Sequence, residues 1–307
     1  MTVADCRRML HRGATSVVVD PVRGGELAAM AIDGRQVLAT VPWERAARPT
    51  TEAPSEDQWT DAWSGGWQLA LPNAGDAGEL DGVAYSFHGL ASFSPWELLA
   101  DFEDRVSLGW SAGGLRVLRH VTVLDRGVHV ACDVAVDGHE SVALIITEHL
   151  ILGATITDDG YRIIAPDAPF VDLLSAERTT VRWRDVSAHG DPATWSVVSA
   201  TDHRARYGAL GPVDRGEVQL FAGSGIELEL TWDASLFPYL WIWQEQLGTD
   251  AAPWLGSTRA LGLEPSTVGQ GDGLAPAVAR GTALIMGPGE HRSWTITLNE
   301  RDSSTNS

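Results

Sequence analysis

The chain has 307 residues, with 22 basic and 41 acidic side chains and a formal net charge of −19. This charge repels phosphate backbones and anionic lipid, so nucleic acid and membrane surfaces are poor partners and an uncharged ligand is favoured. All of the basic residues are Arg, which excludes chemistry that depends on Lys, such as Schiff-base catalysis.

Taken in chain order, the predicted elements are almost all β-strands, because apolar and polar residues alternate with a period of two. In 128–137, for example, Val128, Val130 and Cys132 share one face and His129 and Asp133 share the other. The predicted strands are 15–20, 26–32, 115–124, 128–137, 141–151, 178–186, 217–222, 226–232, 238–244, 282–286 and 293–298. Many short strands separated by turn signals predict an all-β fold, a sandwich or a barrel.

The remaining segments predict little helix and no domain boundary. The polar stretch 44–62 is typical of a long surface loop, with the composition of a lid. A capping-box pattern at 94–97 predicts one short helix or tight turn over 94–102. We expect one domain over 1–307, with a frayed tail over 299–307.

Two further features bear on location. The first residues lack the apolar run of a secretory signal, and about 18 consecutive apolar residues, the length of a membrane span, occur nowhere. Cys6 and Cys132 do not form a disulfide framework, and Cys132 is expected to be a core residue. A cytoplasmic protein is therefore expected.

The 13 Trp residues favour a carbohydrate-binding cleft, because the apolar faces of sugar rings stack on indoles. Trp232 and Trp294 lie on alternating strand patterns and are expected in the core. For Trp67, Trp241 and Trp243, a core position and a place in the cleft are both open. Further Trp residues cluster near these three in the sequence, namely Trp59, Trp63 and Trp254.

Three polar residues stand out as candidates for chemistry. His88 closes a turn-rich segment, His149 lies on an apolar strand face, and Glu264 sits between Leu263 and Pro265. A single His of this kind is more often structural than functional. The alternative is that Glu264 has only a structural role, as a carboxylate facing a turn at the end of a strand.

Seven short motifs then follow in a recognisable order along the chain. They are Gly65-Gly66-Trp67-Gln68, Leu71-Pro72-Asn73-Ala74-Gly75-Asp76, Phe87-His88-Gly89, Ser94-Pro95-Trp96-Glu97, Glu148-His149, Trp241-Ile242-Trp243-Gln244-Glu245 and Leu263-Glu264-Pro265-Ser266-Thr267. In this order the chain resembles the aldose 1-epimerase family, the galactose-mutarotase-like sugar epimerases, from about residue 15 to residue 298.

The resemblance implies a large antiparallel β-sandwich with a sugar cleft on a concave face. It implies Glu264 as the catalytic base, His149 as the acid and His88 as a substrate-binding residue. It also implies contacts of Gln244, Asn73 and Trp67 with sugar hydroxyls.

The chain departs from the family pattern at two places. Trp67-Gln68 stands where well-characterised members have an Asn-Arg pair, and Glu148 precedes the acid His where Asn or His is usual. These departures bear on the substrate more than on the fold.

The implied reaction interconverts the two anomers of an aldose. A base takes the proton of the C1 hydroxyl and an acid protonates the ring oxygen, so that the ring opens and can reclose on the other face. Burial should raise the pKa of Glu264, and the ordinary pKa of His, about 6.5, suits a proton donor near pH 7. No metal or cofactor is needed for these steps.

Two alternatives remain open. His88, His149 and Glu264 could hold a divalent metal for lyase or isomerase chemistry on a sugar, although close-spaced ligand pairs such as His-x-His are missing. The chain could also bind sugar without turning it over. A phosphorylated sugar is less favoured, because Arg204 and Arg206 form the only close basic pair in the loops of the second half, and we expect both on a solvated face.

Overall fold

The computed structural model describes residues 7–49, 53–186 and 195–301. Nearly every alternating segment forms a strand whose apolar face is buried. Along Gly127–Val136 (β11), buried residues alternate with half-exposed ones, as the sequence pattern predicted. The predicted all-β class is confirmed: strand makes up 49% of the described residues and helix 8%.

The larger sheet has eleven antiparallel strands and carries the candidate site on its outer face. Its order is β1 (Arg8–Arg12), β2 (Thr15–Asp20), β3 (Glu26–Ile32), β5 (Trp67–Ala70), β13 (Thr147–Leu152), β22 (Arg259–Ser266), β21 (Tyr239–Gln246), β18 (Arg204–Leu210), β15 (Pro169–Asp172) and β16 (Thr180–Arg182), with β4 (Arg35–Gln36) paired to β3.

The second sheet has nine strands and packs against the inner face of the first. Its order is β17 (Val197–Val198), β14 (Tyr161–Ile164), β19 (Gly216–Ala222), β20 (Glu227–Trp232), β24 (His291–Glu300), β11, β10 (Leu115–Leu124), β9 (Arg105–Ala112) and β8 (Glu97–Asp101). Two ribbons complete the strands, β6 (Gly78–Leu80) with β7 (Val83–Tyr85) and β12 (Val142–Leu144) with β23 (Leu284–Met286).

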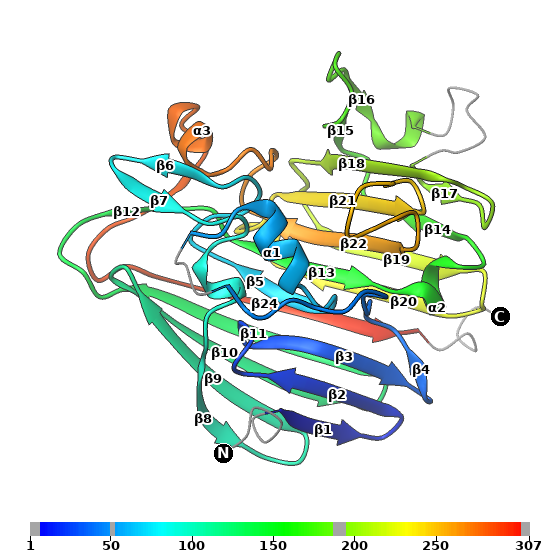
Figure 1. Ribbon diagram of the computed structural model, residues 1–307, viewed down its shortest axis with the longest axis horizontal. Coiled ribbons are helices and arrows are strands. Elements are labelled where there is room, and N and C mark those ends of the chain that lie inside the picture. Colours follow the sequence, from blue (N-terminus) through cyan, green and yellow to red (C-terminus); the bar gives the residue numbers. More distant parts are fainter. Residues whose placement is uncertain (1–6, 50–52, 187–194, 302–307) are drawn as a thin grey trace.

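The main apolar core lies between the two sheets, which are stacked in Figure 1. Trp232, Trp294 and Cys132 are buried in this core, as predicted. A buried ion pair joins the two layers, because Arg119 on β10 donates to both carboxylate oxygens of Glu148 on β13, at 2.9 and 2.8 Å. The chain is therefore a β-sandwich whose layers are connected by apolar packing and by this pair.

Glu148 requires a correction. The resemblance suggested that this residue bears on the substrate, but its side chain points into the core, on the opposite side of β13 from His149. It accepts hydrogen bonds from the indoles of Trp67 and Trp294 as well as from Arg119. This departure therefore affects the packing between the sheets.

The helices among the described residues are short: α1 (Glu56–Ala62), α2 (Ala154–Thr157), α3 (Leu274–Ala279) and the 3₁₀ turns η2 (Leu90–Ser92) and η3 (Trp183–Asp185). Two expectations were wrong. Part of the loop predicted over 44–62 is helix α1, which begins at a capping box between Ser55 and Gln58. The helix or turn predicted over 94–102 is instead strand β8, which pairs with β9.

Two smaller expectations are also corrected. Residues 299 and 300 belong to strand β24, and Glu300 forms ion pairs with Arg35 and Arg126. The frayed tail therefore does not begin at residue 299. Arg204 and Arg206 lie on strand β18 and not in a loop. Cys6 and the residues after 301 lie outside the described residues. In the described part, no helix is long and apolar enough to cross a membrane.

Candidate functional site

Side chains from four neighbouring strands form one row on the outer face of the larger sheet. Gln68 on β5 is paired with His149 on β13, and Glu264 on β22 is paired with Trp241 on β21. The register that pairs Thr147 with Ser266 also brings His149 opposite Glu264. Directly opposite residues point to the same face, so Gln68, His149, Glu264 and Trp241 form one row, and the last three of them form a floor.

Above this floor lies a cavity of about 450 Å³, a volume suited to a small ligand. Its lining includes five Trp and the polar candidates His88, His149 and Glu264. The full lining is Glu56, Trp59, Thr60, Trp63, Gly75, Asp76, Phe87, His88, His149, Leu174, Ala205, Tyr207, Trp241, Trp243, Glu245, Thr249, Trp254, Glu264 and Gly271.

One side of the aromatic wall of the cavity comes from helix α1 and its C-cap, Trp63. Trp59 and Trp63, one turn apart, stack with ring centroids 5.9 Å apart, and Trp59 also lies over the rings of His88 and His149 at 4.8 and 5.5 Å. Trp63 continues the wall to Trp254, 5.8 Å away. The predicted Trp-rich cleft is therefore present as a cavity wall of contiguous indoles.

His88 is held by two reciprocal hydrogen bonds to Gly75. The backbone N–H of Gly75 donates to Nδ1 of His88 at 3.2 Å, and the backbone N–H of His88 donates to the carbonyl of Gly75 at 3.1 Å. His88 has a φ of 54°, in the left-handed region, which is unusual for a residue other than Gly. The N–H of Gly75 and the left-handed backbone of His88 together fix the ring at the cavity edge.

Glu264 is 3% exposed, and among the described residues its carboxyl has no hydrogen-bonding partner. Burial raises the pKa of Glu264 to about 8, as we expected from its apolar neighbours. Space for this carboxyl is left by Gly262 on the same face of β22, since a Cβ at Gly262 would lie 2.5 Å from Oε1 of Glu264.

His149 is 6% exposed, and its Nδ1 lies 3.0 Å from Oε1 of Gln68. Burial lowers the pKa of His149 to about 3, and it also lowers that of His88, whose ring centroid is 4.6 Å away. The expectation of a His149 pKa close to neutrality was therefore wrong. Both shifts favour the uncharged forms, a protonated Glu264 and a neutral His149.

Three residues expected to contact sugar lie elsewhere. Trp67 is fully buried between the sheets and Gln244 is in the core, where it donates to the carbonyl of Trp195 at 2.8 Å. Asn73 is fully buried and holds the 73–88 segment together through hydrogen bonds with Asp76, Ser86 and Leu274. Alternation along β5 and β21 explains the first two, since Gln68 and Trp243 are their outward-facing neighbours.

Other cavity residues were not singled out in the sequence. Tyr207 faces the cavity from β18, and Glu245 from β21 bonds back to the N–H groups of Gly248 and Thr249. Glu56 and Asp76 add two carboxyls. Glu245 lies on the same face of β21 as Trp241 and Trp243, so strand alternation predicts it at the cavity. Within the described residues, no group of three His, Cys, Asp or Glu side chains could hold a metal ion.

Comparisons with known proteins identify the fold. No family model matches the chain. No curated protein matches it either. Among solved structures, a "putative aldose 1-epimerase" from Klebsiella pneumoniae is 14% identical over 96% of this chain and 82% of its own, with a TM-score of 0.72.

A second "putative aldose 1-epimerase", from Escherichia coli, is 13% identical and has a TM-score of 0.68, covering 96% of this chain and 98% of its own. A galactose mutarotase-like protein from Lactobacillus casei is 12% identical, with a TM-score of 0.63, and covers 96% of this chain and 100% of its own. The chain therefore has the fold of the galactose mutarotase-like proteins.

Proposed function

We propose that the protein is an aldose 1-epimerase-like isomerase that interconverts the anomers of an unphosphorylated sugar. The observation that carries the proposal is the pairing of Glu264 with His149 on the floor of a cavity walled by indoles. A carboxyl and an imidazole side by side can give and take the two protons that ring opening requires.

The reaction needs these two groups and no redox step. One group removes the proton of the C1 hydroxyl while the other protonates the ring oxygen, and the C1–O5 bond breaks to give the open-chain aldehyde. After rotation about C1–C2, the same steps in reverse close the ring as the other anomer. His88, on the cavity edge beside His149, is placed to hold the sugar during this rotation.

The test is proton NMR of anomer exchange across a panel of aldoses, with and without protein. Glu264→Gln keeps the shape of the side chain but cannot exchange a proton, so turnover should fall at least about 10²-fold while sugar binding persists. His149→Asn should behave similarly, whereas His88→Asn should weaken binding as well. Exchange near the wild-type rate in a folded Glu264→Gln protein would contradict the proposed mechanism and leave sugar binding alone.

Chelation distinguishes the alternative that His88, His149 and Glu264 act through a metal. We expect anomer exchange to be unchanged by EDTA, because proton transfer between Glu264, His149 and the sugar needs no Lewis acid. Loss of activity that a divalent ion restores would replace this mechanism by metal-assisted chemistry.

A further inference from the structure

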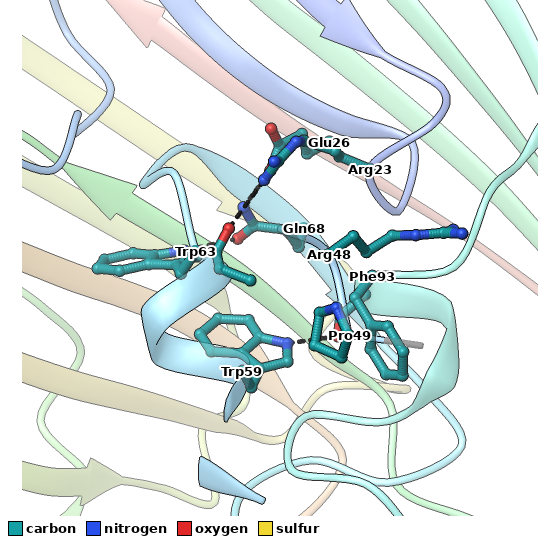
Figure 2. Close-up of a pocket in the computed structure, with 10 residues that line it drawn as sticks. Arg23, Glu26, Arg48, Pro49, Trp59, Trp63, Gln68 and Phe93 are labelled. Atoms are coloured by element: carbon teal, nitrogen blue, oxygen red, sulfur yellow. Dashed lines mark hydrogen bonds between the residues drawn. The ribbon is translucent and has the colours of Figure 1, made fainter. Parts of the chain in front are cut away.

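Gln68 connects the cavity floor to a buried carboxylate on the far side of helix α1. Its Oε1 faces Nδ1 of His149 at 3.0 Å, and its Nε2 donates to Oε2 of Glu26 at 2.9 Å. Figure 2 shows Glu26, Gln68 and Trp63 together, with dashed lines along their hydrogen bonds. Glu26, Gln68 and His149 thus form a buried chain across strands β3, β5 and β13.

Groups of fixed polarity determine the orientation of the Gln68 amide. The carbonyl of Gly65 can only accept, and it receives a hydrogen bond from Nε2. The indole of Trp63 can only donate, and it lies 3.4 Å from Oε1. If the amide oxygen and nitrogen were exchanged, the nitrogen would face the indole N–H of Trp63, donor against donor. The oxygen would face the carbonyl of Gly65, acceptor against acceptor. Oε1 must therefore face His149, and Nδ1 of His149 must carry the hydrogen.

Glu26 holds the other end of this chain. It is 3% exposed, its two carboxyl oxygens share the single hydroxyl of Ser64 at 2.6 and 2.8 Å, and Oε2 also accepts from Gln68. Burial raises the pKa of Glu26 above its ordinary value. Whether ionised or protonated, the carboxyl still offers Oε2 as an acceptor to Gln68, so the amide keeps its orientation.

The second cavity histidine has the opposite arrangement. Nδ1 of His88 accepts from the backbone N–H of Gly75, which is only a donor, so the hydrogen of a neutral His88 is on Nε2. In their neutral forms the two neighbouring rings therefore differ: His88 presents an N–H donor at Nε2, and His149 presents a lone pair at Nε2. Among the described residues, no group is hydrogen-bonded to Nε2 of His149.

We propose that Gln68, held by Glu26 and Trp63, is a positioning residue that keeps the hydrogen of His149 on Nδ1 and so makes Nε2 the proton acceptor of the cavity. The inference rests on the proposed function. In ring opening, the proton of the C1 hydroxyl then passes to Nε2 of His149, the proton of Glu264 passes to the ring oxygen, and the C1–O5 bond breaks. Reclosure returns both protons. The roles implied by the family resemblance are thereby exchanged.

The direct test is long-range proton–nitrogen NMR of protein labelled with ¹⁵N-histidine, which distinguishes protonated from unprotonated ring nitrogens. The signals of His88 and His149 are assigned by their loss in His88→Asn and His149→Asn. We expect wild-type His149 to carry its hydrogen on Nδ1 and His88 on Nε2, so that each ring is the internal control of the other. A hydrogen on Nε2 of His149 in the wild type would overturn the proposal, and the variants serve only to assign the two signals.

Variants then test the role of Gln68. Gln68→Met removes the acceptor, so we expect hydrogen on Nε2 of His149 in a large part of the molecules, with His88 unchanged. A double variant, Glu26→Gln with Gln68→Glu, swaps the two side chains. It restores an acceptor beside Nδ1 of His149 and should restore the wild-type tautomer. Gln246→Met, a fully buried Gln outside the cavity lining, is the matched control and should change neither ring. An unchanged His149 in Gln68→Met would show that Gln68 does not set the tautomer.

Kinetics separate this inference from the proposed function. We expect Gln68→Met to lower kcat about tenfold or more with KM close to the wild-type value, because the sugar contacts remain and the proton acceptor is lost. An equal loss in Gln246→Met would point to a general packing defect. A wild-type protein that accelerates no aldose would refute the proposed function, while the tautomers of the two rings would still be decided by NMR.

Discussion

Glu264 and His149 lie opposite each other on two adjacent strands, and burial acts on them in opposite senses. Loss of hydration disfavours the charged form of each group, so the pKa of the carboxyl rises to about 8 and that of the imidazole falls to about 3. Burial thus favours the uncharged form of both groups. The pair can exchange protons with a neutral sugar without first burying a charge.

The stability of the protein should report the protonation of Glu264 directly. The folded-state pKa is above the ordinary value of 4.5, so ionisation favours the unfolded chain, and the stability due to the neutral carboxyl is lost as pH rises towards 8. Glu264→Gln should therefore be more stable than the wild type, by a margin that is near zero at pH 4 and grows by roughly 1.4 kcal/mol per pH unit up to about pH 8.

Thermal or urea unfolding from pH 4 to pH 9 measures this margin. The control is Glu97→Gln, because the Glu97 side chain is exposed at the start of β8, outside the cavity lining, and the substitution should leave the pH dependence unchanged. A margin for Glu264→Gln that does not change with pH would show that Glu264 is ionised in the folded protein.

The site residues that could be predicted are those whose position follows from strand parity or from the motifs. His88, His149 and Glu264 were expected at the site and line the cavity. Trp241 and Trp243 share the parity of the cavity face of β21, and Gln244, which follows Trp243, must point into the core. Strand alternation alone predicts a core position for Gln244, whereas the motif implied a contact with sugar.

Tyr207 illustrates what the sequence could not predict. Strand β18, Arg-Ala-Arg-Tyr-Gly-Ala-Leu, has no clear apolar alternation, because four of its residues are half-exposed and the strand lies near the edge of the sheet. Its place beside the cavity depends on the pairing of Tyr207 with Trp243. Such pairing between distant segments is decided by tertiary packing.

Helix α1 is the element that gives the cavity its aromatic wall. Its seven residues are too few to form a stable isolated helix, so it depends on its cap and on packing. Ser55 accepts from the N–H of Gln58, and the Gln58 side chain accepts from the N–H of Ser55. Trp59 is anchored by its indole to the hydroxyl of Ser92 at 2.9 Å.

Removing the cap should therefore weaken sugar binding. Ser55→Ala leaves the N–H of Gln58 without its acceptor and should destabilise the first turn by about 1 kcal/mol. Because this turn positions Trp59 and Trp63, we expect the Kd for a bound aldose to rise severalfold in calorimetric titration. Ser224→Ala removes an exposed serine bond to the carbonyl of Thr155, outside the cavity, and should leave Kd unchanged. Wild-type affinity in Ser55→Ala would show that the cap does not control the wall.

At the scale of the whole molecule, the sandwich was predictable because burial of alternate residues repeats along strand after strand. The order of the strands was not, since β5, β13 and the consecutive pair β21 and β22 are neighbours in the sheet but come from three distant parts of the sequence. The site row crosses these four strands, so its members could be suspected individually but not placed next to one another. Figure 1 shows the same point, as strands of different colours lie side by side.

The carboxyl side chains at the cavity should select substrates by their charge. Four carboxyl side chains line it, Glu56, Asp76, Glu245 and Glu264, and none of the described lining residues is Arg. Burial and the nearby carboxylates raise the pKa of Glu56 and of Asp76, which is evidence of a negative potential at the cavity. A phosphorylated or carboxylated sugar would meet this potential without a compensating cation.

We therefore expect an aldohexose to bind at least about tenfold more tightly than its 6-phosphate at low salt. Raising the salt from about 0.01 to about 0.5 M should reduce this preference, because the screening length falls from about 30 Å to a few Å. Asp76→Asn should reduce it as well, whereas Glu103→Gln, an exposed carboxyl outside the cavity lining, should not. Calorimetric titration of both sugars at two salt concentrations measures each effect. Equal affinity for the two sugars at low salt would mean that the cavity carboxyls do not select against anions, and the proposed substrate class would have to include sugar phosphates.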